Sequence, residues 1–211
     1  MERFGVDLWL APAFNLHRSP LCGRNFEYFS EDPLLSGVFG AAITQGVQAH
    51  PSRFVTIKHF CCNNQEYTRY QNNSILSERA LREIYLKSYE ICIAQANPRC
   101  LMTSYNLING VHAAESSDLL KTVLREEWGW TGLIVTDWVV GALNDKTCKH
   151  RPTLAAPAIK AGNDLVMPGS ATDYKSVLSA LKGKNKDFTL SREEAEFCAV
   201  HLVELVQSVA E

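Results

Sequence analysis

Five short apolar runs along the chain predict buried β-strands. Each run holds four to six residues and is rich in Ile, Val, Leu or Phe, with polar residues at its ends. Runs of this length and composition are typical of strands that are buried in a parallel sheet. They lie at about residues 6–11, 54–59, 100–104, 133–137 and 164–167.

The segments between these runs carry apolar residues at helical spacing and have recognisable helix ends. Asp32 before Pro33 predicts an N-cap with proline in the first turn. Gly162 predicts a helix stop, and Ser191 with Glu194 forms a capping box. The predicted helices lie at about residues 33–49, 77–96, 119–129, 154–161, 174–181 and 191–208.

Strands that alternate with helices predict an α/β fold with a parallel sheet. The polar segments after the strands are long (12–31, 61–74, 105–116 and 138–151), whereas those leading back into strands are shorter. Long loops on one rim are typical of a (β/α)8 TIM-barrel-like fold. Because a full barrel takes about 250 residues, we expect residues 1–211 to form a single, partial barrel domain. Its open strand edges favour a homo-oligomer.

Composition and charge narrow the possible classes of partner. With 46% hydrophobic and 21% charged residues, the chain resembles a globular domain, and its net charge of -2 offers no basic surface for nucleic acid. No apolar run approaches the roughly 20 residues that span a membrane. The first residues lack the apolar core of a secretory signal. We therefore expect a cytoplasmic protein that binds neither nucleic acid nor membrane.

The cysteines predict reduced thiols rather than a disulfide framework. There are seven, an odd number, and no CxxC motif occurs. Cys148 and His150 are the nearest approach to a metal motif, but two residues are too few for a metal site. No metal and no cofactor are expected.

Two of the predicted strands end in residues that can carry chemistry. The run at 133–137 ends on Asp137, which Trp138 follows, and the run at 54–59 ends in Lys58 and His59. A carboxylate at the end of a buried strand is costly unless its charge is used. Since parallel strands bring their carboxyl ends to one edge, the sequence predicts a single pocket there.

Six stretches, taken together and in this order, carry a specific pattern. They include Ile-Lys-His-Phe-Cys-Cys-Asn-Asn-Gln-Glu and Thr-Asp-Trp, and they lie at residues 10–18, 20–33, 57–66, 102–106, 136–138 and 161–169. Over nearly its full length the chain therefore resembles glycoside hydrolase family 3, the β-glucosidase family. The resemblance implies a TIM-barrel-like glycosidase that acts by the retaining mechanism, with two carboxyl groups about 5 to 5.5 Å apart.

The resemblance assigns a role to each matching residue. Asp137 is implied to be the nucleophile, the alternative being a helix cap or a surface acid. Lys58 and His59 are implied to be the sugar-binding pair. Arg69 is implied to donate to a sugar hydroxyl with Glu66 as its orienting partner, although either residue alone is compatible with a surface charge.

Further contacts are implied on neighbouring loops. Arg24 matches a sugar-contacting arginine of the family. Tyr105 matches a pocket tyrosine whose hydroxyl lies near the nucleophile, and Trp138 offers a flat face to the substrate. Met102 is a candidate for the pocket floor. Core packing is the alternative for Tyr105 and Met102, and packing under the rim is the alternative for Trp138.

Two parts of the family pattern are missing. No acid/base residue is found. In most of the family a glutamate on a separate α/β domain fills this role, and one branch uses a histidine that residues 61–64 do not provide. The early barrel segment is also missing, so the chain matches the carboxyl-terminal portion of a member with swapped domains. The expected substrate is a β-glucoside or a related sugar such as a xyloside. A catalytically inactive sugar-binding or structural fragment is the alternative function, and an aldolase using Lys58 is a more distant one.

Overall fold

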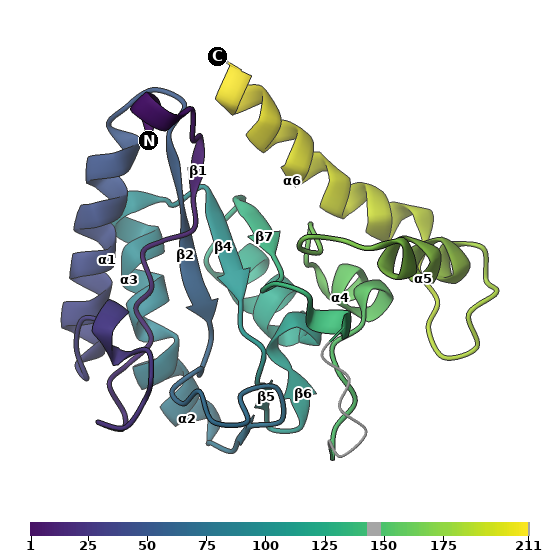
Figure 1. Cartoon of the computed structure of the whole chain (residues 1–211), viewed down its shortest axis with the longest axis horizontal. Coiled ribbons are helices and arrows are strands. Elements are labelled where there is room, and N and C mark those ends of the chain that lie inside the picture. The colour runs from purple at the N-terminus through teal and green to yellow at the C-terminus, as the bar shows by residue number, and fades with distance from the viewer. Residues whose placement is uncertain (143–148, 211) are drawn as a thin grey trace.

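A four-stranded parallel sheet forms the centre of the molecule (Figure 1). The computed structural model describes residues 1–142 and 149–210. The strand order is β1-β2-β4-β7, so the strands follow each other across the sheet in the order of the sequence. Their bounds are Leu8–Trp9 (β1), Phe54–Phe60 (β2), Cys100–Thr103 (β4) and Leu133–Val135 (β7).

Helices connect the strands close to the predicted positions. Asp32 caps the first helix by accepting a hydrogen bond from Leu34 N at 2.7 Å, and Ser191 and Glu194 form the predicted capping box. The α-helices are Pro33–Gln48 (α1), Glu78–Ala80 (α2), Lys87–Ala96 (α3), Ala155–Ala161 (α4), Ala171–Leu181 (α5) and Arg192–Ala210 (α6). Two π-helices occupy Leu81–Tyr85 and Asp118–Glu127, and short 3-10 turns occupy Glu2–Phe4, Asn25–Glu27, Ala113–Glu115 and Val140–Ala142.

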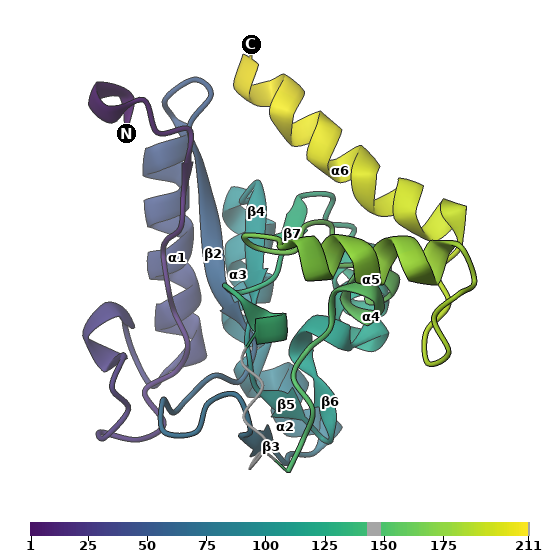
Figure 2. The same cartoon turned by 45° about the vertical axis from the view of Figure 1, so that its right-hand side comes forward.

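The two faces of the sheet are covered differently. Because side chains alternate along a strand, one face presents Val55, Ile57, Leu101 and Ile134, which belong to the larger core cluster together with residues of α1 and α3. The other face presents a smaller cluster against which Leu202 of α6 packs. Figure 2 shows α4, α5 and α6 gathered beyond β7, while α1 and α3 lie on the opposite side of the sheet.

The fifth predicted strand, at residues 164–167, is not formed. Only Leu165 makes a bridge, to Val135 of β7. The reason is that side-chain oxygens accept backbone N–H groups that would otherwise donate to backbone carbonyls of a paired strand. The Asp164 carboxylate accepts the Ile134 N–H at 2.7 Å, and Thr136 Oγ1 accepts the Met167 N–H at 2.9 Å. The segment therefore lies beside β7 without continuing the sheet.

A second, three-stranded sheet lies within the long loops and was not predicted from the sequence. It pairs Asn73–Ser74 (β3) with Leu107–Ile108 (β5), and β5 with Val111–His112 (β6). Each strand has two residues, too few to show an apolar alternation. The sheet ties the loop after β2 to the loop after β4, so both loops are fixed at the rim that holds the predicted chemistry.

The overall architecture confirms the predicted α/β fold with parallel strands and crossover helices. Among residues 1–142 and 149–210 the main sheet stays open, with β1 on one edge and β7 near the other. In the same ranges no helix combines the length and the apolar character needed to cross a membrane.

Candidate active site

Asp137 lies two residues beyond β7, where the strand has placed it at the loop-rich rim. The residue is only 6% exposed. Its Oδ1 accepts the Trp138 N–H at 2.7 Å, and its Oδ2 lies 3.7 Å from His59 Nε2. Burial raises the pKa of Asp137, and this is opposed by the Trp138 N–H, the Tyr105 hydroxyl and the charges of Arg24 and Arg69. The carboxyl group is thus buried, held at one oxygen and close to cations.

The end of β2 delivers two adjacent side chains to the same place. A regular strand would point Lys58 and His59 to opposite faces, but the register of β2 against β4 shifts between Lys58 and Phe60. Such bulges re-aim side chains and are common beside active sites. Both residues consequently face the groups around Asp137.

His59 is held in place by Asn15. The amide of Asn15 donates to the His59 carbonyl at 2.8 Å and accepts the His59 N–H at 3.0 Å, which directs its Oδ1 toward His59 Nδ1 at 3.4 Å. The other ring nitrogen, Nε2, faces the Asp137 carboxylate at 3.7 Å. Burial lowers the pKa of His59 well below its usual value, and the charges of Arg24, Lys58 and Arg69 lower it further.

Lys58 and Arg24 share one carboxylate on the first long loop. Glu27 lies 3.9 Å from Lys58 Nζ through Oε2, while its Oε1 accepts the Arg24 Nε–H. Burial lowers the pKa of Lys58, and Glu27 and Asp137 oppose the change. Glu27 therefore holds Arg24 of its own loop and Lys58 of β2 in place.

Arg69 is oriented by a carboxylate and by aromatic rings. Its Nη1 donates to Glu66 Oε2 at 2.7 Å, and Glu66 Oε1 accepts the Asn63 side-chain amide at 3.0 Å. The guanidinium lies over the rings of Tyr70 and Tyr105, 5.1 and 4.7 Å from their centroids. The predicted pairing with Glu66 is confirmed, and stacking on two rings restricts the arginine further.

Tyr105 and Trp138 complete the site on the side of Asp137. The Tyr105 hydroxyl donates to the Trp138 carbonyl at 2.7 Å and lies beside the Asp137 carboxyl, as predicted. Burial raises the pKa of Tyr105, and the Asp137 charge adds to the effect. Trp138 itself is 45% exposed. Its indole is thus open to solvent at the rim, whereas packing under the rim was the alternative.

Met102 differs from the other predicted contacts. It is 2% exposed and belongs to the apolar cluster with Cys100, Leu133 and Val135. The structure therefore supports the alternative interpretation, in which this methionine fills the core beside β7. The flexible thioether suits that role because it adapts to irregular gaps.

Three residues of the site were missed by sequence reasoning: Asn15, Asn63 and Tyr70. Asn15 and Asn63 are buried polar residues, and their side chains hydrogen-bond to His59 and to Glu66, respectively. The Arg69 guanidinium stacks over the Tyr70 ring. One signal was present, since Asn15 is a lone amide within the apolar stretch at residues 10–16. A polar residue in such a stretch must find a buried partner.

The charges around Asp137 limit what the site can do. Glu27 and Glu66 are each bound to arginine, so neither resembles the neutral acid that a glycosidase needs. Within the part of the chain that the structure describes, no three His, Cys, Asp or Glu side chains cluster as a metal site would require. Of the weak pair Cys148 and His150, Cys148 lies outside the described residues.

One buried carboxylate, Asp137, lies beside cationic side chains and an exposed indole at the loop-bearing edge of a parallel sheet. Comparison with known proteins gives the family. Residues 1–205 match the model of the "Glycosyl hydrolase family 3 N terminal domain". The chain belongs to glycosyl hydrolase family 3, as its motifs indicated.

The relatives are β-glucosidases of much greater length. The chain is 42% identical to a β-glucosidase of Ruminococcus albus over 205 residues, covering 96% of this chain and 21% of the relative. It is 48% identical to β-glucosidase B of Emericella nidulans over 165 residues, covering 78% of this chain and 18% of the relative. The chain thus spans about a fifth of these curated relatives.

Solved structures agree with the fold. The structure of β-glucosidase 3B from Thermotoga neapolitana in complex with glycerol matches with a TM-score of 0.87 and 42% identity, covering 98% of this chain and 28% of that one. The Kluyveromyces marxianus β-glucosidase in complex with glucose matches with a TM-score of 0.85 and 36% identity, covering 97% and 23%.

Proposed function

We propose that this chain is the nucleophile-bearing part of a retaining β-glucosidase. The observation that carries the proposal is the setting of Asp137, which is buried beside His59 and within the field of Arg24 and Arg69. Cations near a carboxylate favour its ionised form. A retaining glycosidase needs such an anion next to donors that can bind sugar hydroxyls.

The contacts assign a separate task to each carboxyl oxygen. Oδ1 is held by the Trp138 amide, so Oδ2, on the side of His59, is the oxygen that attacks the anomeric carbon. The bond from that carbon to the leaving oxygen breaks as the new ester bond forms, which gives a covalent glycosyl-enzyme. The Tyr105 hydroxyl steadies the carboxyl group during this step.

The sugar-binding groups surround the nucleophile. Lys58, Arg24 and Arg69 supply charged donors for the hydroxyl groups, and the His59 imidazole supplies a further hydrogen-bonding group. Each arginine is already oriented by a glutamate, so less side-chain freedom is lost when a sugar binds. Trp138 offers its exposed indole to a sugar ring or to the aglycone.

The second carboxyl group of the mechanism must come from elsewhere. Its proposed source is a companion domain with a glutamate, because Glu27 and Glu66 are both occupied by arginine. Neither a metal nor a cofactor is required by this mechanism. The choice among glucosides, xylosides and other sugars depends in part on that missing domain.

The dependence on the leaving group tests the proposal. A 2,4-dinitrophenolate departs without protonation, whereas a phenolate needs the acid that this chain lacks. The chain should release one equivalent of dinitrophenol from 2,4-dinitrophenyl β-glucoside and then stall, and it should release no phenol from phenyl β-glucoside. Asp137→Asn should release neither.

The opposite results are equally clear. Rapid turnover of phenyl β-glucoside would show that the acid/base residue lies within the chain. Release of dinitrophenol by Asp137→Asn at the normal rate would exclude Asp137 as nucleophile. Glucose binding in a calorimeter without any release would favour the inactive sugar-binding fragment instead.

We also propose that the isolated chain self-associates through the open side of its sheet. Helix α6 presents exposed Val200, Val203 and Val206 next to that side, and β1 has a free edge among the described residues. Sedimentation velocity should show a dimer or larger species. A monomer at all concentrations would refute this.

We further propose that the protein resides in the reducing environment of the cytoplasm. The six cysteines for which the structure describes a state are free and buried. Free thiols of this kind persist where glutathione and thioredoxin act. Localisation of a tagged full-length protein to the cytoplasm is the expected result, and recovery from the culture medium would contradict it.

A further inference from the structure

Two adjacent cysteines directly follow strand β2, and their sulfurs face each other. Cys62 Sγ donates to Cys61 Sγ across 3.8 Å, although successive side chains of an extended strand point to opposite faces. Cys62 has a φ of 62°, in the left-handed region that non-glycine residues rarely adopt. This turn at the strand end brings the two thiols to the same side.

The surrounding hydrogen bonds hold this arrangement. Ser104 Oγ and Asn106 Nδ2 both donate to the Cys61 carbonyl, at 2.8 and 3.2 Å. Ser74 Oγ and the Asn64 N–H donate to the Cys62 carbonyl, at 3.3 and 3.1 Å. Three different segments therefore fix the backbone on which the two thiols sit.

The separation of the sulfurs suits a shared central atom better than a disulfide. The two sulfurs lie 3.8 Å apart, close enough for one added atom to bond to both after a small side-chain adjustment. A disulfide needs sulfurs about 2.05 Å apart and α-carbons at least about 4.4 Å apart. Neighbouring α-carbons are only about 3.8 Å apart, so the bond would be strained.

We propose that Cys61 and Cys62 form a dithiol site that takes a monosubstituted trivalent arsenical, bound through both sulfurs. Such a reagent offers two positions for sulfur and keeps its organic group in the third. This matches the protein, because no third His, Cys, Asp or Glu joins the pair among residues 1–142 and 149–210.

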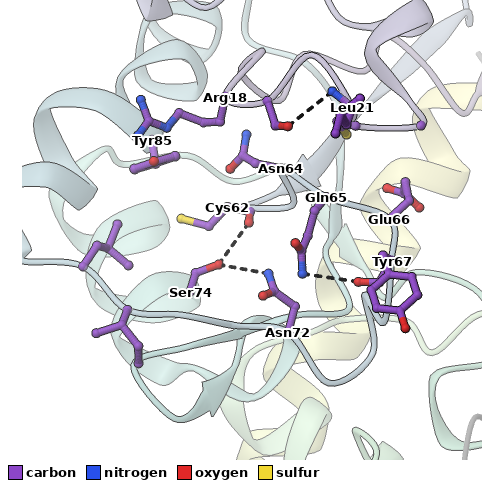
Figure 3. A pocket seen from close by; sticks show the side chains of 15 residues that line it. Arg18, Leu21, Cys62, Asn64, Gln65, Glu66, Tyr67, Asn72, Ser74 and Tyr85 are labelled. Atoms are coloured by element: carbon purple, nitrogen blue, oxygen red, sulfur yellow. Dashed lines mark hydrogen bonds between the residues drawn. The ribbon is translucent and has the colours of Figure 1, made fainter.

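A cleft gives access to the site and room for the organic group. It encloses about 800 Å³ between the loops after β1 and β2, and Cys62 lines it (Figure 3). Ile75, Leu76 and Tyr85 line the same cleft and offer apolar surface for an aryl group. Cys62 is reached first, since Cys61 has no exposed surface.

The bond changes balance without an oxidant. For phenylarsine oxide in its hydrated form, two arsenic–oxygen bonds break and two arsenic–sulfur bonds form. The two hydroxyl groups leave as water with the two thiol protons, and no atom changes oxidation state. Burial raises the pKa of Cys61 well above its usual value, so this thiol stays protonated and resists simple alkylation.

The test uses the 211-residue chain and phenylarsine oxide, followed by intact mass and peptide mapping. The adduct should join Cys61 and Cys62, and a dithiol such as 2,3-dimercaptopropanol should remove it. Excess 2-mercaptoethanol should not remove the adduct, because an arsenical held by two sulfurs of one backbone is bound about 100-fold or more tightly than one held by a single sulfur.

Three variants make the test decisive. Cys61→Ala and Cys62→Ala should each lower the apparent affinity by about 100-fold, and either one suffices if the other does not fold. Cys22→Ala is the matched control, since Cys22 is buried and lines the same cleft. It should bind as the unaltered chain does.

Three results would overturn the proposal. The first is that 2-mercaptoethanol removes the adduct from the unaltered chain as readily as from Cys61→Ala. The second is that Cys22→Ala no longer binds the arsenical. The third is that the mapped arsenic bridge joins Cys62 to Cys22. Because the readout is mass and not glycoside cleavage, failure here leaves the proposed β-glucosidase function untouched.

Discussion

Asp164→Asn is expected to destabilise the chain strongly, because Asp164 is a buried anion that joins three elements. Its Oδ2 accepts from Arg125 Nη2 at 2.9 Å and from Ile134 N in β7 at 2.7 Å, and its Oδ1 lies 3.0 Å from His201 Nδ1 in α6. The carboxylate has no exposed surface, and the Arg125 side chain is only 9% exposed. The arginine therefore depends on this partner.

The size of the loss follows from burial. Removing one partner of a buried ion pair costs about 3–5 kcal/mol, since the remaining charge is left without compensation. For a chain of this size, each kcal/mol lowers the melting temperature by about 2–4 °C. The variant should therefore melt about 6–20 °C below the unaltered chain when followed by circular dichroism.

An exposed ion pair provides the control. Arg79 and Glu83 lie 2.9 Å apart, but their side chains are 84% and 59% exposed. Breaking such a pair with Glu83→Gln should cost about 0.2–1 kcal/mol at most. If Asp164→Asn and Glu83→Gln lowered the melting temperature equally, the argument that burial gives this ion pair its value would be refuted.

Three further predictions concern the candidate site. Because burial raises the pKa of Asp137, the folded chain holds that proton more tightly, so the free energy of unfolding should fall as pH rises from about 3.9 through the raised pKa. Urea titrations should show a weaker fall for Asp137→Asn, and identical slopes would contradict this. The lowered pKa of His59 has the opposite effect, so the free energy of unfolding should decline as pH drops below about 6.5. The decline should be less steep in His59→Gln. An unchanged slope of the free energy of unfolding against pH in that variant would count against a buried neutral imidazole. Arg69→Lys should weaken glucose binding by about 10–100-fold in calorimetry, since a charge-assisted hydrogen bond is worth about 1.5–3 kcal/mol, and an unchanged affinity would remove Arg69 from the binding site.

The local patterns in the sequence predicted the helices and most of the sheet well. Caps such as Asp32 and the Ser191–Glu194 pair act between neighbours in the chain, so their signal is local and legible. Helix α5 began earlier than predicted, at Ala171, because Ser170 caps it and the apolar spacing does not start until Tyr174. The failure at residues 164–167 had a long-range cause, since Asp164 bonds to a backbone 30 residues away.

In the candidate site, too, the residues with a local sequence signal were predicted and those that depend on other contacts were not. Asp137, Lys58 and His59 were found because they stand at the ends of apolar runs, where strands deliver side chains to one rim. Asn15 was missed because its importance depends on a contact across the fold, with His59, which lies 44 residues away in the sequence. Met102 was placed in the pocket by resemblance alone, whereas packing against Val135 puts it in the core.

Covalent trapping tests the central claim most directly. A 2-deoxy-2-fluoro-β-glucosyl fluoride carries a leaving group that needs no acid, and its fluorine slows breakdown of the glycosyl-enzyme. We expect a single fluoroglucosyl label per chain, mapped by mass spectrometry to Asp137 and absent from Asp137→Asn. A label on Glu27 or Glu66, or none at all while glucose still binds, would contradict the account.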